Sequence, residues 1–256
     1  MKKEVGISSA TALISDIEGM DDHEGIIEII KHSQKFVLGH IDNIPKPKKY
    51  PHGQKLPYPI SLFEYVIGDC KANGMEKHIL LCICDGVNND IVYILPFGKV
   101  HQIGEKWLSL RVIIKFDTCK GEFLGVKVPK LVGKNKDDVL REMVAGTLGA
   151  LSRILSVLGC NNIYIEKKDV PVKLQKKRIK QNKEPFYSFH VLKIKNTENK
   201  NIKNNKGGHH ASPRVHFRRG HIRNLPDGGT TWVTSCIVGN SGNGFVGKDY
   251  AVGASC

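Results

Sequence analysis

The chain has 256 residues, of which 40% are hydrophobic and 25% charged, and its formal net charge is +14. This length accommodates one large or two modest domains, and the apolar fraction is sufficient for a hydrophobic core. No apolar run approaches the ~20 residues of a membrane-spanning helix, and the first residues lack the apolar stretch of a signal peptide. We therefore expect a globular protein of the cytoplasm with no membrane partner. The seven cysteines are scattered and odd in number, which favours reduced thiols.

Residues 1–50 are expected to form an N-terminal helical segment. Apolar residues fall near helical spacing at Ile26, Ile29, Ile30, Phe36 and Val37. The prolines at 45 and 47 end this pattern.

A second region, residues 51–160, is expected to be an antiparallel sheet with a helix packed on it, and it is the candidate for peptide or partner recognition. Prolines on both sides of Tyr58 predict an extended approach into residues 62–65. Strands are expected at residues 79–84, 91–95 and 107–116, with turn residues between the first two. The clearest helix spans 138–158, because leucines and valines recur along one face before Gly159.

The third region, residues 161–256, is expected to be a basic module rich in β-hairpins. A strand near 162–165, a short basic helix at 172–182 and a strand at 187–194 precede its Lys- and Asn-rich tract. The fold class is therefore α+β: an antiparallel sheet with a packed long helix, plus a smaller basic C-terminal module.

The positive charge is concentrated between Cys160 and Arg223, where 12 Lys and 5 Arg stand against 4 acidic residues, a net +13. Such a concentration attracts phosphate backbones, so a polyanion, with RNA or the ribosome preferred, is the expected partner. A solvated lysine-rich surface is the alternative, since residues 195–206 resemble a low-complexity loop. The candidate nucleic-acid contacts are Lys176, Lys177, Arg178, Lys180, Arg214, Arg218, Arg219 and Arg223.

The turn sequence at 226–229 predicts a hairpin that pairs residues 215–225 with 230–238. The apolar residues of its first strand change parity, which suggests a bulge at Gly220. With that bulge, one exposed strand face would carry His216, Arg218, His221 and Arg223.

Two imidazoles beside guanidinium groups suit work on a phosphodiester. His216 and His221 could act as general base and general acid while Arg218 stabilises charge on phosphorus, giving a metal-independent ribonuclease. The same residues could equally bind phosphate without catalysis, or an arginine could stack on Trp232 as a structural contact.

No metal and no cofactor are expected. His209 and His210 could join the strand histidines as ligands, but Asp227 is the only carboxylate close to them in sequence.

The C-terminal region resembles a known group of proteins. Its marks are HASPRVHFRRGHIRNLPDGGTTWV, CIVGN and KDY within residues 208–250, with LPYP at 56–59 and NKEP at 182–185 upstream. These motifs resemble a widespread phage and prophage family, and the resemblance covers most of the chain beyond about residue 50. One branch of that family looks like the type V-A anti-CRISPR proteins, which block synthesis of the CRISPR effector nuclease by recognising its nascent N-terminal peptide and causing loss of its messenger RNA.

The resemblance implies that the central region recognises a nascent host defence protein and that the basic module contacts RNA or the ribosome. The candidate partner-binding residues are Tyr58, Phe63, Glu64 and Tyr65. Leu62 departs from the family pattern, where an aromatic residue is expected, and residues 1–50 show no resemblance.

Three other functions are compatible with the basic region. The first is the ribonuclease. A DNA-binding phage regulator is the second, although no helix-turn-helix pattern is present. The third is a virion or assembly protein that contacts the packaged genome.

Overall fold

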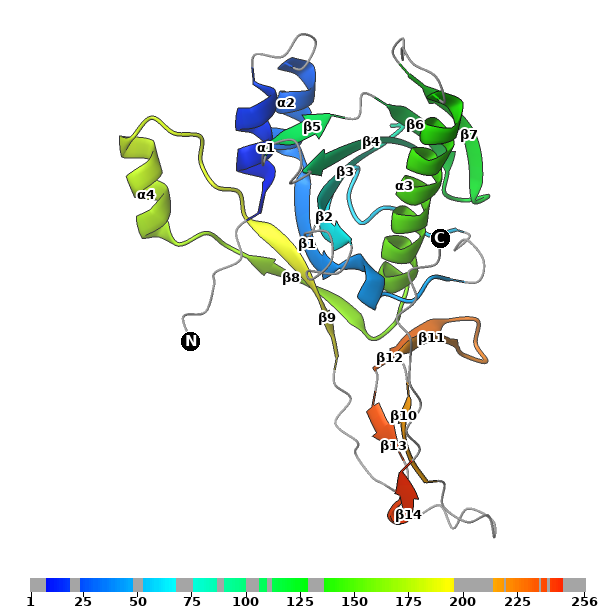
Figure 1. Cartoon of the computed structure of the whole chain (residues 1–256). Coiled ribbons are helices and arrows are strands. Elements are labelled where there is room, and N and C mark those ends of the chain that lie inside the picture. Colours follow the sequence, from blue (N-terminus) through cyan, green and yellow to red (C-terminus); the bar gives the residue numbers. More distant parts are fainter. Residues whose placement is uncertain are drawn as a thin grey trace.

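The computed structural model confirms an α+β fold, in which helices cover both faces of a large sheet and two small sheets follow (Figure 1). It describes residues 8–18, 24–47, 53–67, 76–86, 90–99, 106–109, 112–128, 136–195, 214–218, 220–234, 236–238 and 240–245. The helices are α1 (Ala10–Ile17), α2 (Glu24–His32), η1 (Ile41–Asn43), α3 (Lys136–Leu158) and α4 (Val172–Lys180). The main sheet contains β1 (Gln34–His40), β2 (Ile60–Ile67), β3 (Glu76–Cys84), β4 (Ile91–Lys99), β5 (Trp107–Ser109), β6 (Ile113–Asp117), β7 (Glu122–Lys127), β8 (Ile163–Lys168) and β9 (Phe189–Ile194).

The main sheet is mixed rather than wholly antiparallel. Its strand order is β7-β6-β4-β3-β2-β1-β9-β8, with β5 paired to β4. The expected meander is confirmed for β3, β4 and β6, which pair antiparallel in turn, and β7, which was not expected, extends it. The single strand expected at 107–116 is instead two strands, β5 and β6. In contrast, β1 pairs parallel with both β2 and β9, so strands far apart in sequence meet at the centre of the sheet.

One face of the sheet is covered by α1 and α2. Leu62, Ile79, Leu81 and Phe97 project from the strands into this layer and are fully buried. The middle residues of β2 and β3 are buried on both faces, and their sequences are nearly continuous apolar runs, whereas the first residues of β4 are buried at alternate positions.

Two charged side chains fix the ends of these helices. The Glu64 carboxylate accepts hydrogen bonds from the backbone N–H of Ser9, at 2.7 Å, and from its hydroxyl, at the start of α1. Lys35 Nζ donates to the carbonyl oxygens of Ile30, Lys31 and Ser33 at 2.7, 2.8 and 2.7 Å, at the end of α2. An acidic group at a helix N-terminus and a basic group at a C-terminus both complement the helix dipole.

The opposite face is covered by α3, whose apolar stripe is core as expected. Leu151, Ile154 and Leu155 are fully buried against Phe63 and Leu80 of the sheet. The helix begins at Lys136, two residues before the expected start, and ends at Leu158 as expected.

The N-terminal 50 residues contain a strand that the sequence pattern did not indicate. Phe36 and Val37, expected in a helix, lie in β1. The expected boundaries at residues 50 and 160 do not separate sheets, because β1, β8 and β9 belong to the same sheet as β2–β7.

The expected hairpin forms, but in two pieces. β11 (His221–Asn224) pairs with β12 (Thr230–Val233), while β10 (Arg214–Arg218) pairs with β13 (Cys236–Val238) and with β14 (Asn240–Phe245). The turn is closed by a hydrogen bond from Leu225 N–H to Gly229 O at 2.7 Å, and Gly228 has a φ of 82°, which favours glycine.

The bulge expected at Gly220 is absent. His216 lies opposite Val238 and His221 lies opposite Val233. The step from 216 to 221 has the same length as the step from 233 to 238, so neither side contains the extra residue of a bulge. The strand breaks instead, and its two halves belong to different small sheets (Figure 1).

Candidate nucleic-acid interface

The basic helix α4 projects from the main body as an arm between β8 and β9 (Figure 1). Its inward side contacts the chain that returns to the sheet. The Gln175 amide pairs with both backbone groups of Phe186, with N···O distances of 2.5 and 3.0 Å. Arg178 lies 4.1 Å above the Phe186 ring and donates from Nε to Glu184 O at 2.6 Å. A nine-residue helix is marginal alone, so these contacts hold α4 in place.

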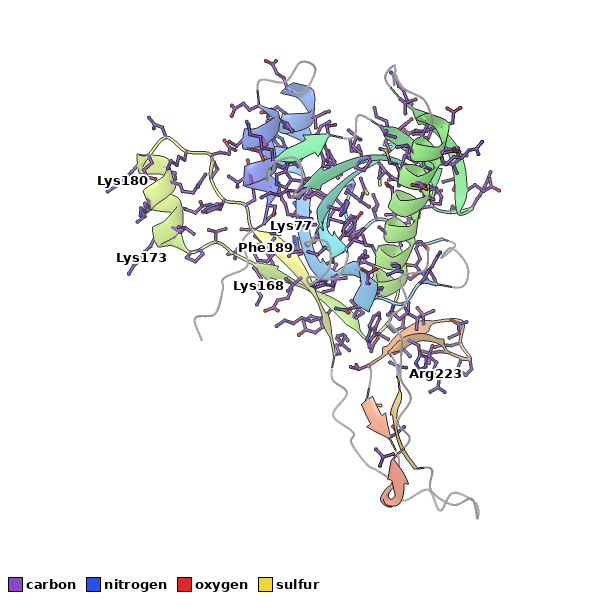
Figure 2. The ribbon with its side chains drawn as sticks, viewed as in Figure 1. Lys77, Lys168, Lys173, Lys180, Phe189 and Arg223 are labelled. Carbon is purple, nitrogen blue, oxygen red and sulfur yellow. The ribbon has the colours of Figure 1, made fainter. Side chains whose placement is uncertain are left out.

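The outward side of α4 carries a stripe of lysines, Lys173, Lys176, Lys177 and Lys180, which we call the α4 stripe. They occur at helical spacings of 0, 3, 4 and 7 residues, so they share one side, and all are exposed. Lys173 and Lys180 mark its two ends in Figure 2. Among the residues that the structure describes, no carboxylate forms an ion pair with any lysine of the stripe.

Lysines nearer the sheet are paired with acids. Glu166 lies 2.5 Å from Lys168 Nζ and 2.6 Å from Lys193 Nζ, and these hydrogen bonds lower the pKa of its carboxyl group. Lys167 lies 3.3 Å from Asp169. Among the described lysines of α4, β8 and β9, the four of the α4 stripe therefore lack an acidic partner, whereas Lys167, Lys168 and Lys193 have one.

The base of the arm is tied to the sheet. The Ser188 hydroxyl donates to Asp169 at 2.9 Å, which together with Lys167 lowers the pKa of that carboxyl group. Thr11 of α1 donates to Pro185 O at 2.9 Å. The Lys35 ammonium lies 4.2 Å above the Tyr187 ring. The arm is thus attached to both the sheet and the α1–α2 layer.

The Lys35 ammonium at the base of the arm is buried. Burial lowers its pKa to about 8, and at neutral pH it is protonated. Because its donors are occupied by the end of α2, Lys35 is a structural cation and not a contact for RNA.

The structure distributes the expected basic contacts differently. Lys176, Lys177 and Lys180 are exposed on the α4 stripe, whereas Arg178 faces inward and holds the arm. The expectation missed Lys173, although its helical spacing from Lys177 and Lys180 places it on the same side.

The four residues expected on one strand face belong to two strands. His216 and Arg218 lie in β10, and His221 and Arg223 lie in β11 of the other small sheet. Arg223 is exposed on this hairpin (Figure 2), and His221 is half-buried. The backbone of Arg214 is placed in β10, while Arg219 lies outside the described residues. The side chains of His216 and Arg218 lie outside the described residues, so the single-face arrangement and the acid–base role of these residues stay predictions.

Three of the four candidate partner-binding residues are buried. Phe63 and Tyr65 belong to the core beneath α3, and Glu64 binds Ser9 at the start of α1. Tyr58 alone reaches the surface, with 36% of its side chain exposed, where its ring lies 5.6 Å from the ring of His190. In this structure Phe63, Glu64 and Tyr65 hold the fold and offer no contact surface to a partner.

The described residues contain no group of three or more His, Cys, Asp or Glu side chains arranged to hold a metal ion. His209 and His210, the alternative ligands, lie outside that part of the chain. Within the same described ranges, none of the helices combines the length and apolar character needed to cross a bilayer.

In comparisons with known proteins, no family model matches the chain, and neither a curated protein nor a solved structure matches it. The phage and anti-CRISPR resemblance therefore stays a prediction.

Proposed function

We propose that this protein is a phage or prophage counter-defence protein that acts in the cytoplasm of a bacterial host, at translation or messenger RNA. Its α4 stripe binds the RNA backbone, and the hairpin β11–β12 adds Arg223 as a further contact. The resemblance to inhibitors of effector synthesis supplies the biological setting, and the charges of the arm supply the mode of binding.

The observation that carries the proposal is the contrast between α4 and its surroundings. Lysines of β8 and β9 are paired with Glu166 and Asp169, while the α4 stripe is exposed and has no acidic partner among the described residues. Unpaired lysines at this density bind phosphates mainly through counterion release, without reading bases. Choice of the target message therefore falls to another part of the chain or to the nascent protein itself.

Transcript sequencing of a bacterial host tests this proposal. One culture expresses the wild-type protein and another expresses a variant with Lys173, Lys176, Lys177 and Lys180 all replaced by Gln. We expect selective loss of one or a few messages with the wild type only, together with ribosome association on gradients that the variant loses.

A matched control replaces four exposed lysines elsewhere, Lys46, Lys77, Lys106 and Lys120, by Gln, which gives the same change in net charge. This control should behave as the wild type. If no transcript changes and no ribosome association is detected with wild-type protein, the proposal is wrong. Binding to purified phage particles or a preference for duplex DNA would point instead to the virion or regulator alternatives.

A further inference from the structure

A groove lies at the other end of the main sheet from α4, on strands β4, β6 and β7. It has a volume of about 450 Å³ and is lined by Tyr93, Ile113, Lys115, Leu124, Gly125, Val126 and Lys127. β7 and β8 are the opposite edges of the sheet, and at ~4.8 Å between adjacent strands the path across the sheet from one edge to the other is roughly 34 Å. The groove is therefore a separate site.

The groove opens on a part of the sheet that α1 and α2 leave uncovered. Tyr93 and Lys115 are paired across β4 and β6, and Lys115 pairs with Gly125 of β7. The neighbours Val92 and Ile114 point the other way, into the core beneath α3. The groove therefore lies on the face opposite α3.

Gly125 creates the space. Its φ is 147°, a conformation that other residues rarely adopt, and a β-carbon at this position would meet no atom within 4 Å. Beside it, the irregular pairing of β6 with β7 leaves Leu124 without a partner, and its side chain is 44% exposed. The result is an open apolar floor where a neighbouring strand residue would ordinarily project.

The rim of the groove is aromatic and positively charged. Lys115 Nζ lies 5.6 Å from the centroid of the Tyr93 ring, so a cation and an aromatic ring face the same space. Lys127 is exposed at the edge of the groove. Neither lysine forms an ion pair with a carboxylate among the described residues.

We propose that this groove binds a nucleotide, with the base on the apolar floor beside Tyr93 and the phosphate between Lys115 and Lys127. The volume lies within the usual range of small-molecule sites, which are mostly apolar with a few polar groups at defined positions. A planar apolar ring joined to an anion matches both parts of the lining. An acidic peptide would supply the charge but no flat group for the floor. This site is independent of RNA binding by the α4 stripe.

Calorimetric titration of the full chain tests the proposal with adenosine and uridine monophosphates, a tetra-adenylate RNA and inorganic phosphate. We expect saturable nucleotide binding that Lys115→Gln or Lys127→Gln weakens about tenfold each, as loss of a hydrogen bond to a charged group predicts. Tyr93→Leu should weaken it by a similar factor through lost stacking, whereas Tyr93→Phe retains the ring and should bind normally. The double variant Lys46→Gln/Lys106→Gln is the matched control and should bind as the wild type does.

The ligands distinguish the source of the nucleotide. These two ligands are compared in the Gln variant of the α4 stripe, so that RNA binding by the arm does not contribute. In that variant, equal affinity for monophosphates and tetra-adenylate indicates a free nucleotide. Tighter binding of tetra-adenylate that Lys115→Gln or Lys127→Gln weakens indicates a segment of single-stranded RNA, and both outcomes support the site. No saturable binding, or binding of inorganic phosphate as tight as that of the nucleotides, overturns it. The Gln variant of the α4 stripe should keep nucleotide binding, so failure at the groove and failure at the arm are separable.

Discussion

Salt dependence is the most direct quantitative test of the α4 stripe, because its slope counts the phosphates that a protein neutralises. The stripe covers seven residue steps of helix, about 10 Å. Phosphates of a stacked strand recur every ~3.4 Å, so the stripe can contact about three of them. Each phosphate neutralised on a single strand contributes ~0.7 to the slope of log affinity against log salt concentration. Replacing the four lysines by Gln should therefore make this slope shallower by about 2. Between about 50 and 200 mM salt, the wild type should therefore lose roughly 20-fold more affinity than the variant.

Fluorescence anisotropy with a labelled single-stranded RNA of about 20 nucleotides measures both slopes across this salt range. The control variant at Lys46, Lys77, Lys106 and Lys120 has the same net charge as the stripe variant. Its slope should stay near that of the wild type, because its lysines lie away from the arm. Equal slopes for all three proteins would refute the contact, and an equal decrease in both variants would show that net charge alone attracts RNA.

Three further outcomes are expected from the structure. Lys35→Met should destabilise the fold by roughly 2–4 kcal/mol at pH 7, because the last carbonyls of α2 lose their donor. Since the folded-state pKa of Lys35, about 8, lies below that of the unfolded chain, the unfolded state binds more protons above pH 8 and the Lys35 contribution to stability rises with pH. In denaturant unfolding, the free energy of unfolding of the wild type minus that of the Met variant should therefore increase by roughly 2 kcal/mol between about pH 8 and pH 9.5. A difference that stays constant over this range would contradict the prediction. Asn162→Ala removes two hydrogen bonds to the backbone of Trp232, so the hairpin β11–β12 should open more often and trypsin should cleave faster at Arg223. Unfolding of the main sheet should change little. Unchanged cleavage would show that other contacts hold the hairpin. Purified protein should leave RNA intact in chelator, because His216 and His221 lie in different sheets, and cleavage lost in both His→Ala variants would reverse that conclusion.

The sequence predicted correctly those elements whose formation depends on a short stretch of neighbouring residues. The apolar stripe of α3, the turn at 226–229 and the short basic helix after Pro171 were all found at or near their expected positions. Each depends on helical spacing, a turn residue or a helix start, which a short stretch of sequence contains.

The central strand β1 was missed because its identity depends on distant partners. Phe36 and Val37 follow a helical stretch closely, and pairing with β2 and β9 decides their conformation. Residues 63–65 were misjudged for a related reason: the family resemblance implied a partner surface there, but Phe63 and Tyr65 belong to the core and Ser9 binds the Glu64 carboxylate.

The candidate site was predicted in part. Charge counting located the basic region, but it could not separate lysines paired with Glu166 from those free on α4, because that distinction depends on strand pairing. The bulge at Gly220 was inferred from the assumption of one continuous strand, which the break between β10 and β11 removes.

The single turn that joins α3 to β8 has a consequence for where the chain tolerates changes in length. Within residues 159–162, Gly159 O accepts from the Thr230 hydroxyl at 3.1 Å, the Asn161 N–H donates to Thr230 O at 2.8 Å, and the Asn162 amide pairs with the Trp232 backbone. One residue inserted near the end of α3 would rotate this turn by about 100° while β8 stays fixed in the sheet, and the hairpin would lose its attachment. An insertion before the start of α3 would leave all of these bonds in place. Length variation should therefore be accepted at one end of the longest helix and rejected at the other.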